Sequence, residues 1–152
     1  MADAAALRKA LDDPDEQVRS QAAVGLAELG DPEALDALIR TIDDAPDPLH
    51  LDMTPAVRAL GTYGPEAFPR LLDLLDAPEE LTRLHAQRAL ELAVYRRHGF
   101  VAGQGFRTAE AEEAARDELR AGGYDYEAEP STRRSAIQRL RARLGVDGPP
   151  AD

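Results

Sequence analysis

The chain has 152 residues, 43% of them hydrophobic, which is enough for one domain with a buried core. It contains no cysteine, which excludes a disulfide framework, a thiolate metal site and a thiol nucleophile. The net charge of −11 falls entirely within residues 1–95, and an acidic surface disfavours nucleic-acid binding.

The N-terminus lacks the basic start and apolar run of a signal peptide. No apolar run approaches the roughly 18 residues that a membrane-spanning helix needs. We therefore expect a soluble, cytoplasmic protein with no membrane partner.

All the predicted elements are helices, because no segment alternates apolar and polar residues as a strand does. In chain order we expect helices over residues 4–11, 15–29, 32–42, 51–62, 65–75, 79–97, 109–121 and 132–144. Asp31, Thr108 and Ser131 are expected to cap three of them, with Pro32 at a first helical position. Pro69 predicts a kink or a late start in the fifth helix.

A motif near the start recurs twice in weaker form, at spacings of 34 and then 30 residues. Ala22, Ala56 and Ala86 form one series, and Leu26, Leu60 and Leu90 form another. The extra residues of the second copy lie at its inter-helix turn, residues 43–51. A fixed period of this length indicates helix pairs that stack and bury a core between neighbours.

Within the first copy, one stripe of the second helix is apolar at helical spacing and should face the core. It consists of Val18, Ala22, Leu26 and Leu29.

Two arginines follow the acidic turns of the first and third copies. We expect Arg19 to pair with Asp13 and Arg83 with Asp76. The second copy has Met53 at this position, so the stack is expected to be irregular there.

These repeats resemble the short HEAT-like repeats of phycobilisome-lyase-type proteins. The matching residues are Asp13-Pro14, Val18-Arg19, Ala22, Leu26 and Gly30-Asp31-Pro32-Glu33-Ala34, with their equivalents in the later copies. A tetratricopeptide repeat has a similar period, but its aromatic signature is absent here. The resemblance implies an all-α fold, an α/α superhelix (HEAT-like solenoid) of about three helix pairs, and it implies no activity.

We expect HEAT-like repeats over residues 1–97 (about 3–30, 31–64 and 65–97), a C-terminal helical cap over 98–144, and a disordered tail over 145–152. Five of the seven aromatic residues lie between positions 95 and 126, where a cap would cover the last repeat. Phe100, Val101 and Phe106 are expected to dock onto the third repeat, with Tyr124 and Tyr126 anchoring the next loop.

The last helix carries five arginines and no acid, with a narrow apolar face. That face consists of Ala136, Ile137, Leu140 and Leu144. Two interpretations stay open: the helix packs on the acidic body, or it is a basic docking surface.

Candidate chemical sites are few. His50, Asp52 and His85 have side chains that can bind a divalent metal. However, the chain has no His-Glu dipeptide, unlike the related deoxyhypusine hydroxylases. The segment 103–108 opens a helix without a P-loop lysine, so we interpret it as a turn. We expect no catalytic residue, no metal and no cofactor.

We therefore predict a noncatalytic interaction scaffold that binds an unidentified protein or peptide in its concave groove. Arg58 and Arg88 occupy equivalent positions away from the leucine stripe. The predicted contact residues are Thr54, Arg58, Gln87, Arg88, Glu91 and Tyr95. We expect a monomer or a weak homodimer. The alternative is a HEAT-like enzyme, either a chromophore lyase or an alkylpurine DNA glycosylase.

Overall fold

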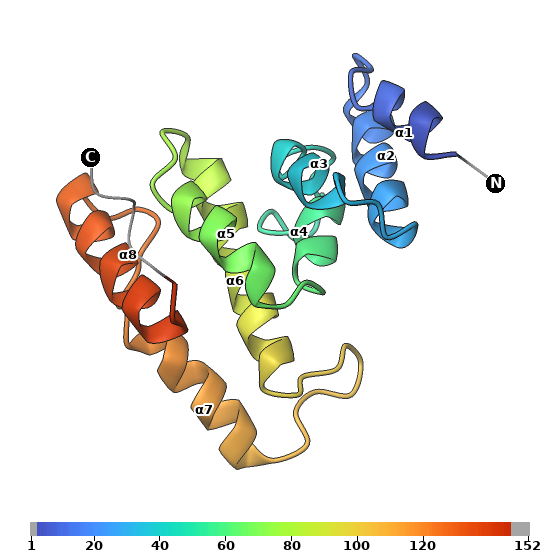
Figure 1. The fold of residues 1–152 in the computed structure, drawn as a ribbon. Helices are drawn as coiled ribbons and strands as arrows, with labels where there is room; N and C mark the ends of the chain where they lie inside the picture. The colour runs from blue at the N-terminus through green and yellow to red at the C-terminus, as the bar shows by residue number, and fades with distance from the viewer. Residues whose placement is uncertain (1–2, 147–152) are drawn as a thin grey trace.

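The computed structural model describes residues 3–146, in which every regular element is a helix (Figure 1). The first six α-helices are α1 Ala4–Ala10, α2 Glu16–Glu28, α3 Ala34–Arg40, α4 Pro55–Leu60, α5 Phe68–Leu74 and α6 Glu80–Arg97. A 3₁₀ turn, η1 Pro65–Ala67, precedes α5, and the chain continues through α7 Ala109–Arg120 and α8 Pro130–Leu144. The only β-type contact in this part of the chain is one bridge between Val101 and Gly105, so the predicted all-α fold is confirmed.

The first six helices form three hairpins that stack in a row, from α1 and α2 to α5 and α6 (Figure 1). Helix α2 packs against α4, and α4 packs against α6. The second helices of the three pairs therefore form one continuous layer, as expected for an α solenoid.

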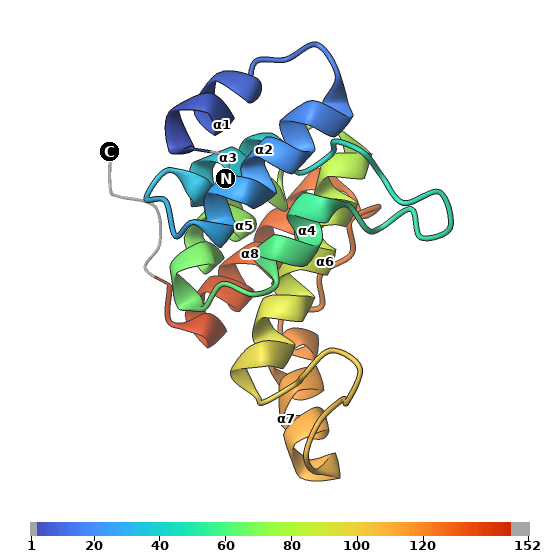
Figure 2. The ribbon, with the colours of Figure 1, turned by 90° about the vertical axis from the view of Figure 1, so that its right-hand side faces the viewer.

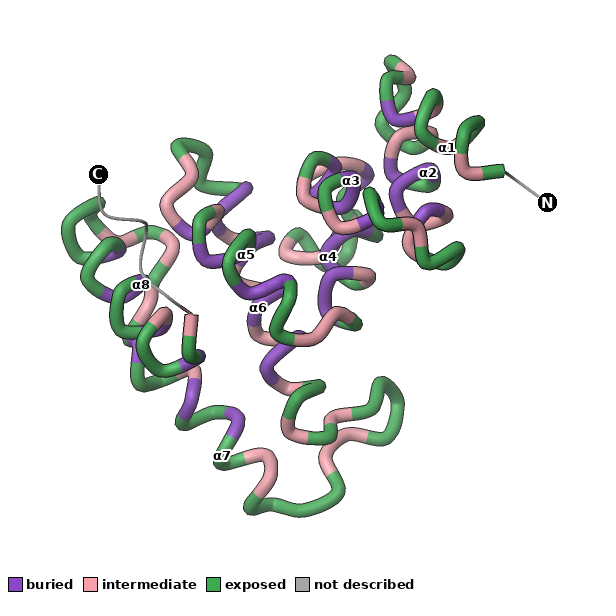
Figure 3. Tube along the Cα trace, in the orientation of Figure 1, coloured by how far each residue is buried: buried purple, intermediate pink, exposed green. Residues whose placement is uncertain are grey.

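The core follows the repeat register that the sequence shows. Both repeat series are buried to 2% exposure or less: Ala22, Ala56 and Ala86, and Leu26, Leu60 and Leu90. Buried positions face one another across the helix pairs (Figure 3). Leu29, predicted on the same stripe, is instead 49% exposed. It lies at the C-cap of α2, where Gly30, with a φ of +66°, turns the chain away from the core.

Two of the predicted helix starts are confirmed. Phe68 and Pro69 open α5 after the 3₁₀ turn, which is the late start that a proline in the first turn allows. The hydroxyl of Thr108 accepts a hydrogen bond from the backbone N–H of Ala111 at 3.1 Å and caps α7.

Two other predicted starts differ. The Asp31 carboxylate accepts from the backbone N–H of Glu33, which closes a turn before the helix, so α3 begins at Ala34. Pro130 begins α8 because its fixed φ suits a first helical position, so Ser131 lies inside the helix and does not cap it.

The second repeat contains a long loop where the sequence predicts the start of a helix. Helix α4 begins only at Pro55, and residues 43–53, here called the insert loop, connect α3 to it. Figure 2 shows this loop projecting from the stack beside α4. The side chains of Leu49 and Leu51 are 85% and 68% exposed.

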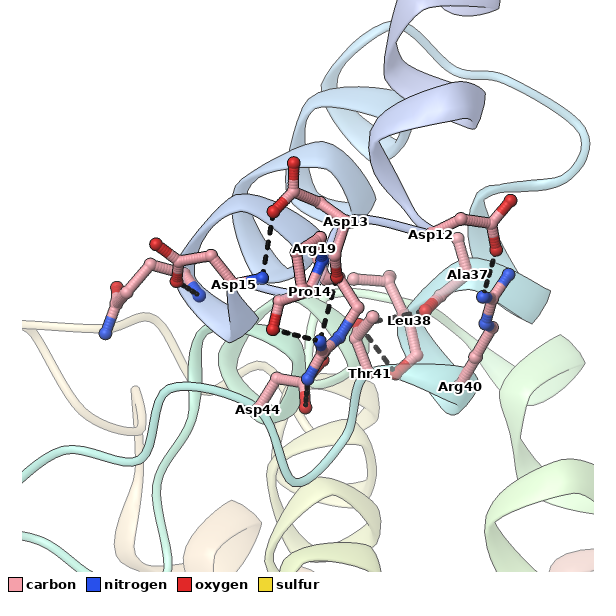
Figure 4. A network of polar contacts seen from close by, with 11 residues as sticks. Asp12, Asp13, Pro14, Asp15, Arg19, Ala37, Leu38, Arg40, Thr41 and Asp44 are labelled. Carbon is pink, nitrogen blue, oxygen red and sulfur yellow. Dashed lines mark hydrogen bonds and ion pairs between the residues drawn. The ribbon is translucent and has the colours of Figure 1, made fainter.

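Arg19 holds the turn of the first repeat, but not through the carboxylate of Asp13 (Figure 4). Its Nη1 donates to the carbonyls of Asp13 and Pro14 at 2.9 and 3.1 Å. Its Nε and Nη2 donate to the carboxylate of Asp44 at 2.9 and 3.0 Å. The Asp13 carboxylate is used within its own turn, where it accepts from the backbone N–H of Asp15.

Arg83 holds the third turn in the same manner. Its Nη1 donates to the carbonyls of Ala77 and Pro78 at 2.9 and 2.8 Å, and its Nε donates to the carbonyl of Tyr126 at 2.8 Å. The predicted pairs of Arg19 with Asp13 and of Arg83 with Asp76 are therefore wrong in their acceptors, which are mainly turn carbonyls.

The two C-terminal helices both pack on the third repeat: α7 packs against α6, and α8 packs against α5. All four residues of the predicted apolar face of α8 are buried: Ala136, Ile137, Leu140 and Leu144. Asp76 pairs with Arg134 at 3.0 Å and with Arg133 at 3.5 Å, and Asp73 pairs with Arg141. The basic helix therefore packs on the acidic body.

The aromatic residues of the C-terminal third partly follow the prediction. Phe100 and Phe106 lie against Tyr95, with ring centroids 6.0 and 5.4 Å from it. The Tyr124 hydroxyl donates to the carbonyl of Leu75 at 2.6 Å, and burial raises the pKa of Tyr124 to about 12. Val101, expected to dock, is 49% exposed because it forms the bridge within its own loop.

The predicted disordered tail, residues 145–152, begins with two placed residues. Gly145 ends α8 in the left-handed region, and Val146 packs against the core. Residues 147–152 lie outside the described residues.

Candidate functional site

A surface hollow of about 440 Å³ lies between the second helices of the first two repeats. Its lining consists of Val24, Ala27 and Glu28 from α2, Pro55, Arg58 and Ala59 from α4, and Thr62 just after α4. Because α2 and α4 pack directly on each other, the floor of the hollow is fixed by the repeat core. A hollow with apolar walls and a few polar groups is the usual form of a binding site.

Arg58 supplies the positive charge of this hollow. Its side chain is exposed, and it forms no hydrogen bond or ion pair with any residue between positions 3 and 146. The other charged residue of the lining is Glu28. The guanidinium of Arg58 therefore keeps its donors available for a ligand.

Thr54 does not belong to this surface, although it was predicted as a contact residue. It is 1% exposed and caps α4, where its hydroxyl accepts from the Val57 N–H at 3.1 Å and donates to the Ile42 carbonyl at 2.8 Å. Threonine is favoured at the N-cap and proline at the first helical position, and its two hydrogen bonds satisfy the buried hydroxyl.

Three of the predicted residues meet on α6. Arg88 pairs with Glu91 at 3.2 Å and with Asp52 of the insert loop at 3.4 Å. The Nε2 of Gln87 donates to Glu91 at 3.3 Å, and Gln87 lines a small cavity of about 40 Å³ toward α7 and α8. Arg88 is therefore committed to intramolecular pairs, unlike its repeat equivalent Arg58.

Tyr95, the last of the predicted residues, lies among Phe100 and Phe106. This cluster joins the end of α6 to the loop that leads to α7. The structure thus places one predicted residue in the hollow, one at a buried helix cap and four on α6. Three of these four form a polar cluster, and the fourth, Tyr95, joins the aromatic cluster.

His50, Asp52 and His85 do not converge on a metal site. His50 is exposed beside Asp47, at 3.3 Å, and Asp52 faces Arg88. Among residues 3–146, no group of three histidine, aspartate or glutamate side chains is arranged to hold a metal ion.

His85 is a fully buried titratable residue, at 0% exposure. Its Nδ1 lies 2.6 Å from a carboxylate oxygen of Asp43, and its Nε2 lies 2.9 Å from the carbonyl oxygen of Leu51. The hydroxyl of Thr82 donates to the other carboxylate oxygen of Asp43 at 2.5 Å. These contacts tie the insert loop to α6 of the following repeat.

His98 lies at the C-cap of α6. Its Nε2 lies 2.5 Å from Glu118, a buried residue of α7 that also accepts from Arg97. The cluster joins α6 to α7.

The segment 103–108 forms the predicted turn before a helix. The backbone N–H groups of Gln104 and Gly105 both donate to the carbonyl of Val101, and Thr108 caps α7. These amides are used within the loop.

Most of the hollow is not predicted from the sequence. Ala27, Pro55 and Ala59 line it but were not predicted. The sequence feature that could have indicated the hollow is the pair Val24 and Ala27, two apolar residues of α2 outside its buried leucine position.

Comparison with protein families gives a match to the model for HEAT repeats over residues 4–91. This match spans more than half of the chain. The chain belongs to the HEAT repeat family. The match confirms HEAT repeats in general and does not test the predicted phycobilisome-lyase type.

HEAT repeats commonly form scaffolds for protein interaction, and the family is generally not enzymatic. No curated protein and no solved structure matches this HEAT repeat chain. None of the helices within residues 3–146 is both long enough and apolar enough to cross a membrane.

Proposed function

We propose that this HEAT repeat chain is a noncatalytic scaffold that binds a segment of a partner protein in the hollow between α2 and α4. The observation that carries the proposal is the position of Arg58. Its guanidinium has no partner among residues 3–146 and lies in a hollow whose other lining residues are mostly small and apolar.

The lining favours a particular ligand chemistry. The guanidinium of Arg58 can bind a carboxylate through two parallel hydrogen bonds. Val24, Ala27 and Ala59 offer an apolar wall for a small aliphatic side chain. Glu28, in the same hollow, disfavours a second acid beside the first. We therefore infer an extended segment with one acidic residue next to an aliphatic one.

The position of Arg88 limits the number of acids. Because Asp52 and Glu91 already occupy its guanidinium, it does not form a second carboxylate site beside Arg58. The net charge of −11 also repels long polyanions. A single acid in an otherwise apolar segment fits this surface better than an acidic run.

The test is a selection from a library of short random peptides on the full chain, followed by affinity measurement of the selected peptides. We expect enrichment of Asp or Glu beside an aliphatic residue. Arg58→Glu should weaken those peptides by about tenfold or more, because a hydrogen bond to a charged group contributes roughly 1.5–3 kcal/mol.

Arg143→Glu is the matched control, since it makes the same charge change at an exposed position of α8. It should leave the affinities unchanged. Equal losses in both variants would mean that only the overall charge matters. Unchanged affinity in Arg58→Glu, or selected peptides without acids, would overturn the proposal.

A further inference from the structure

The hydrogen bonds of His85 define its protonation state. A carboxylate oxygen and a carbonyl oxygen both lack a proton to donate, so each ring nitrogen of His85 has to donate to its neighbour. A neutral imidazole carries a single N–H and would leave one nitrogen facing an acceptor at hydrogen-bond distance. With Asp43 ionised, only the imidazolium satisfies both contacts.

The remaining arrangement would need a protonated Asp43 that donates to Nδ1. The surroundings of Asp43 disfavour it. Burial raises the pKa of Asp43, but the hydrogen bonds from His85 and Thr82 outweigh burial and hold this pKa below its ordinary value. The carboxylate is also 39% exposed, so it stays partly hydrated.

We propose that His85 is a buried imidazolium that fixes the insert loop to α6, and that loss of its proton releases the loop. The device is a pH-sensitive contact between the second and third repeats. It differs from the binding hollow, which lies on α2 and α4, and it does not depend on the proposed function.

The charged groups around His85 come from three elements. The insert loop contributes Asp43 and Asp52, and α6 contributes Arg88, which pairs with Asp52. From α2, Arg19 binds Asp44, the neighbour of Asp43. Asp43 is therefore the carboxylate whose main cationic partner is His85.

The direction of the pH effect follows from these contacts. Burial lowers the pKa of His85. The hydrogen bonds that His85 donates to Asp43 and to the Leu51 carbonyl, together with the charges of Asp43 and Asp52, raise it by more, so the net shift is upward. Because the folded-state pKa is raised, the contribution of His85 to stability is complete below the ordinary histidine pKa of about 6.5. It is lost as pH rises through the folded-state pKa.

On the acid side, the lowered pKa of Asp43 gives the opposite dependence. The contribution of Asp43 to stability is complete above the ordinary aspartate pKa of about 3.9, and it is lost as pH falls through the folded-state pKa of Asp43. The contact is therefore strongest in mildly acidic solution, and the insert loop opens toward alkaline pH.

The experiment is a pH titration of the full chain, observed by NMR at the ring nitrogens of His85 and at the backbone amides of the insert loop. We expect both ring nitrogens to be protonated at neutral pH. Above the His85 pKa, the opening equilibrium of the loop should rise by up to about tenfold per pH unit. The amides of His50 and Met53, which donate within the loop, report this opening after correction for intrinsic exchange.

Two variants decide whether the contact causes the opening. Asp43→Asn should lower the His85 pKa and remove the pH dependence of opening, because the carboxylate that stabilises the imidazolium is gone. His50→Gln removes an exposed histidine of the same loop and should leave the pH dependence intact. One neutral ring nitrogen on His85 at neutral pH in the unmodified chain would overturn the proposal, as would equal pH dependence in Asp43→Asn.

Discussion

The turns of the first and third repeats are held by an arginine of the same repeat, whereas the insert loop of the second is held by its neighbours. Arg19 and Arg83, each the fourth residue of its helix, donate to two carbonyls of the preceding turn. The second repeat has no arginine at the sequence position of Met53. Its loop is bound instead through Asp44 by Arg19 and through Asp43 by His85.

This difference shows how the repeat accommodates an insertion. Two adjacent carboxylates, Asp43 and Asp44, connect the second repeat to the repeats on either side. The arginine contact is insensitive to pH because a guanidinium stays charged, whereas the histidine contact titrates. The same fold therefore contains two turns whose arginine contacts do not change with pH and one loop whose histidine contact does.

The largest effect is expected in the core that lies under both kinds of turn. Leu26→Ala should destabilise the chain by roughly 2–5 kcal/mol, because it leaves a cavity at a fully buried position. Leu29→Ala should cost less than about 1 kcal/mol, since Leu29 is 49% exposed at the end of the same helix. Chemical denaturation of the two variants measures both values. Similar losses would contradict the assigned boundary of the core.

An intermediate effect is expected at an arginine-held turn. Arg83→Met should destabilise the chain by roughly 1.5–3 kcal/mol. Arg83 is only 7% exposed, and three backbone carbonyls lose its charged donors. Denaturation at several pH values should give a constant loss. Arg70→Met is the control, since Arg70 makes one ion pair with Asp36 at the surface, and such pairs contribute about 0–1 kcal/mol. Equal losses in both variants would mean that the turn carbonyls do not need the arginine.

Much of the fold was predictable because the repeat register is a property of the chain itself. The spacing of Ala22, Ala56 and Ala86 places the buried face of each second helix without any tertiary information. The late start of α5 follows from the fixed φ of Pro69, and the apolar face of α8 follows from helical spacing. Each of these depends on local geometry.

The candidate site was less predictable because it depends on which side chains find intramolecular partners. Arg58 and Arg88 are equivalent in the repeat, yet Arg88 is paired by Asp52, which comes from the irregular loop. The repeat pattern places Tyr95 at the groove, but the loop after α6 brings Phe106 against it, and the fold of that loop does not follow from the repeat. Thr54 could have been recognised, since a threonine before a proline indicates a helix start.

The smallest effect is expected when each of the two adjacent carboxylates of the insert loop, Asp43 and Asp44, is replaced in turn. Asp44→Asn should lower the thermal midpoint modestly, because it removes the hydrogen-bonded pair with Arg19, whose pKa is raised by that contact and whose charge persists. The loss of stability should be the same at about pH 6 and about pH 9, since neither pH titrates an arginine.

Asp43→Asn should behave differently. Its loss should be larger at the acidic value and should shrink toward the alkaline value, where the unmodified chain has itself lost the His85 contact. Thermal melts of both variants across this range make the comparison directly. If both losses vary equally with pH, the titrating group lies elsewhere; if both stay constant, His85 keeps its proton throughout and the insert loop is as indifferent to pH as the arginine-held turns.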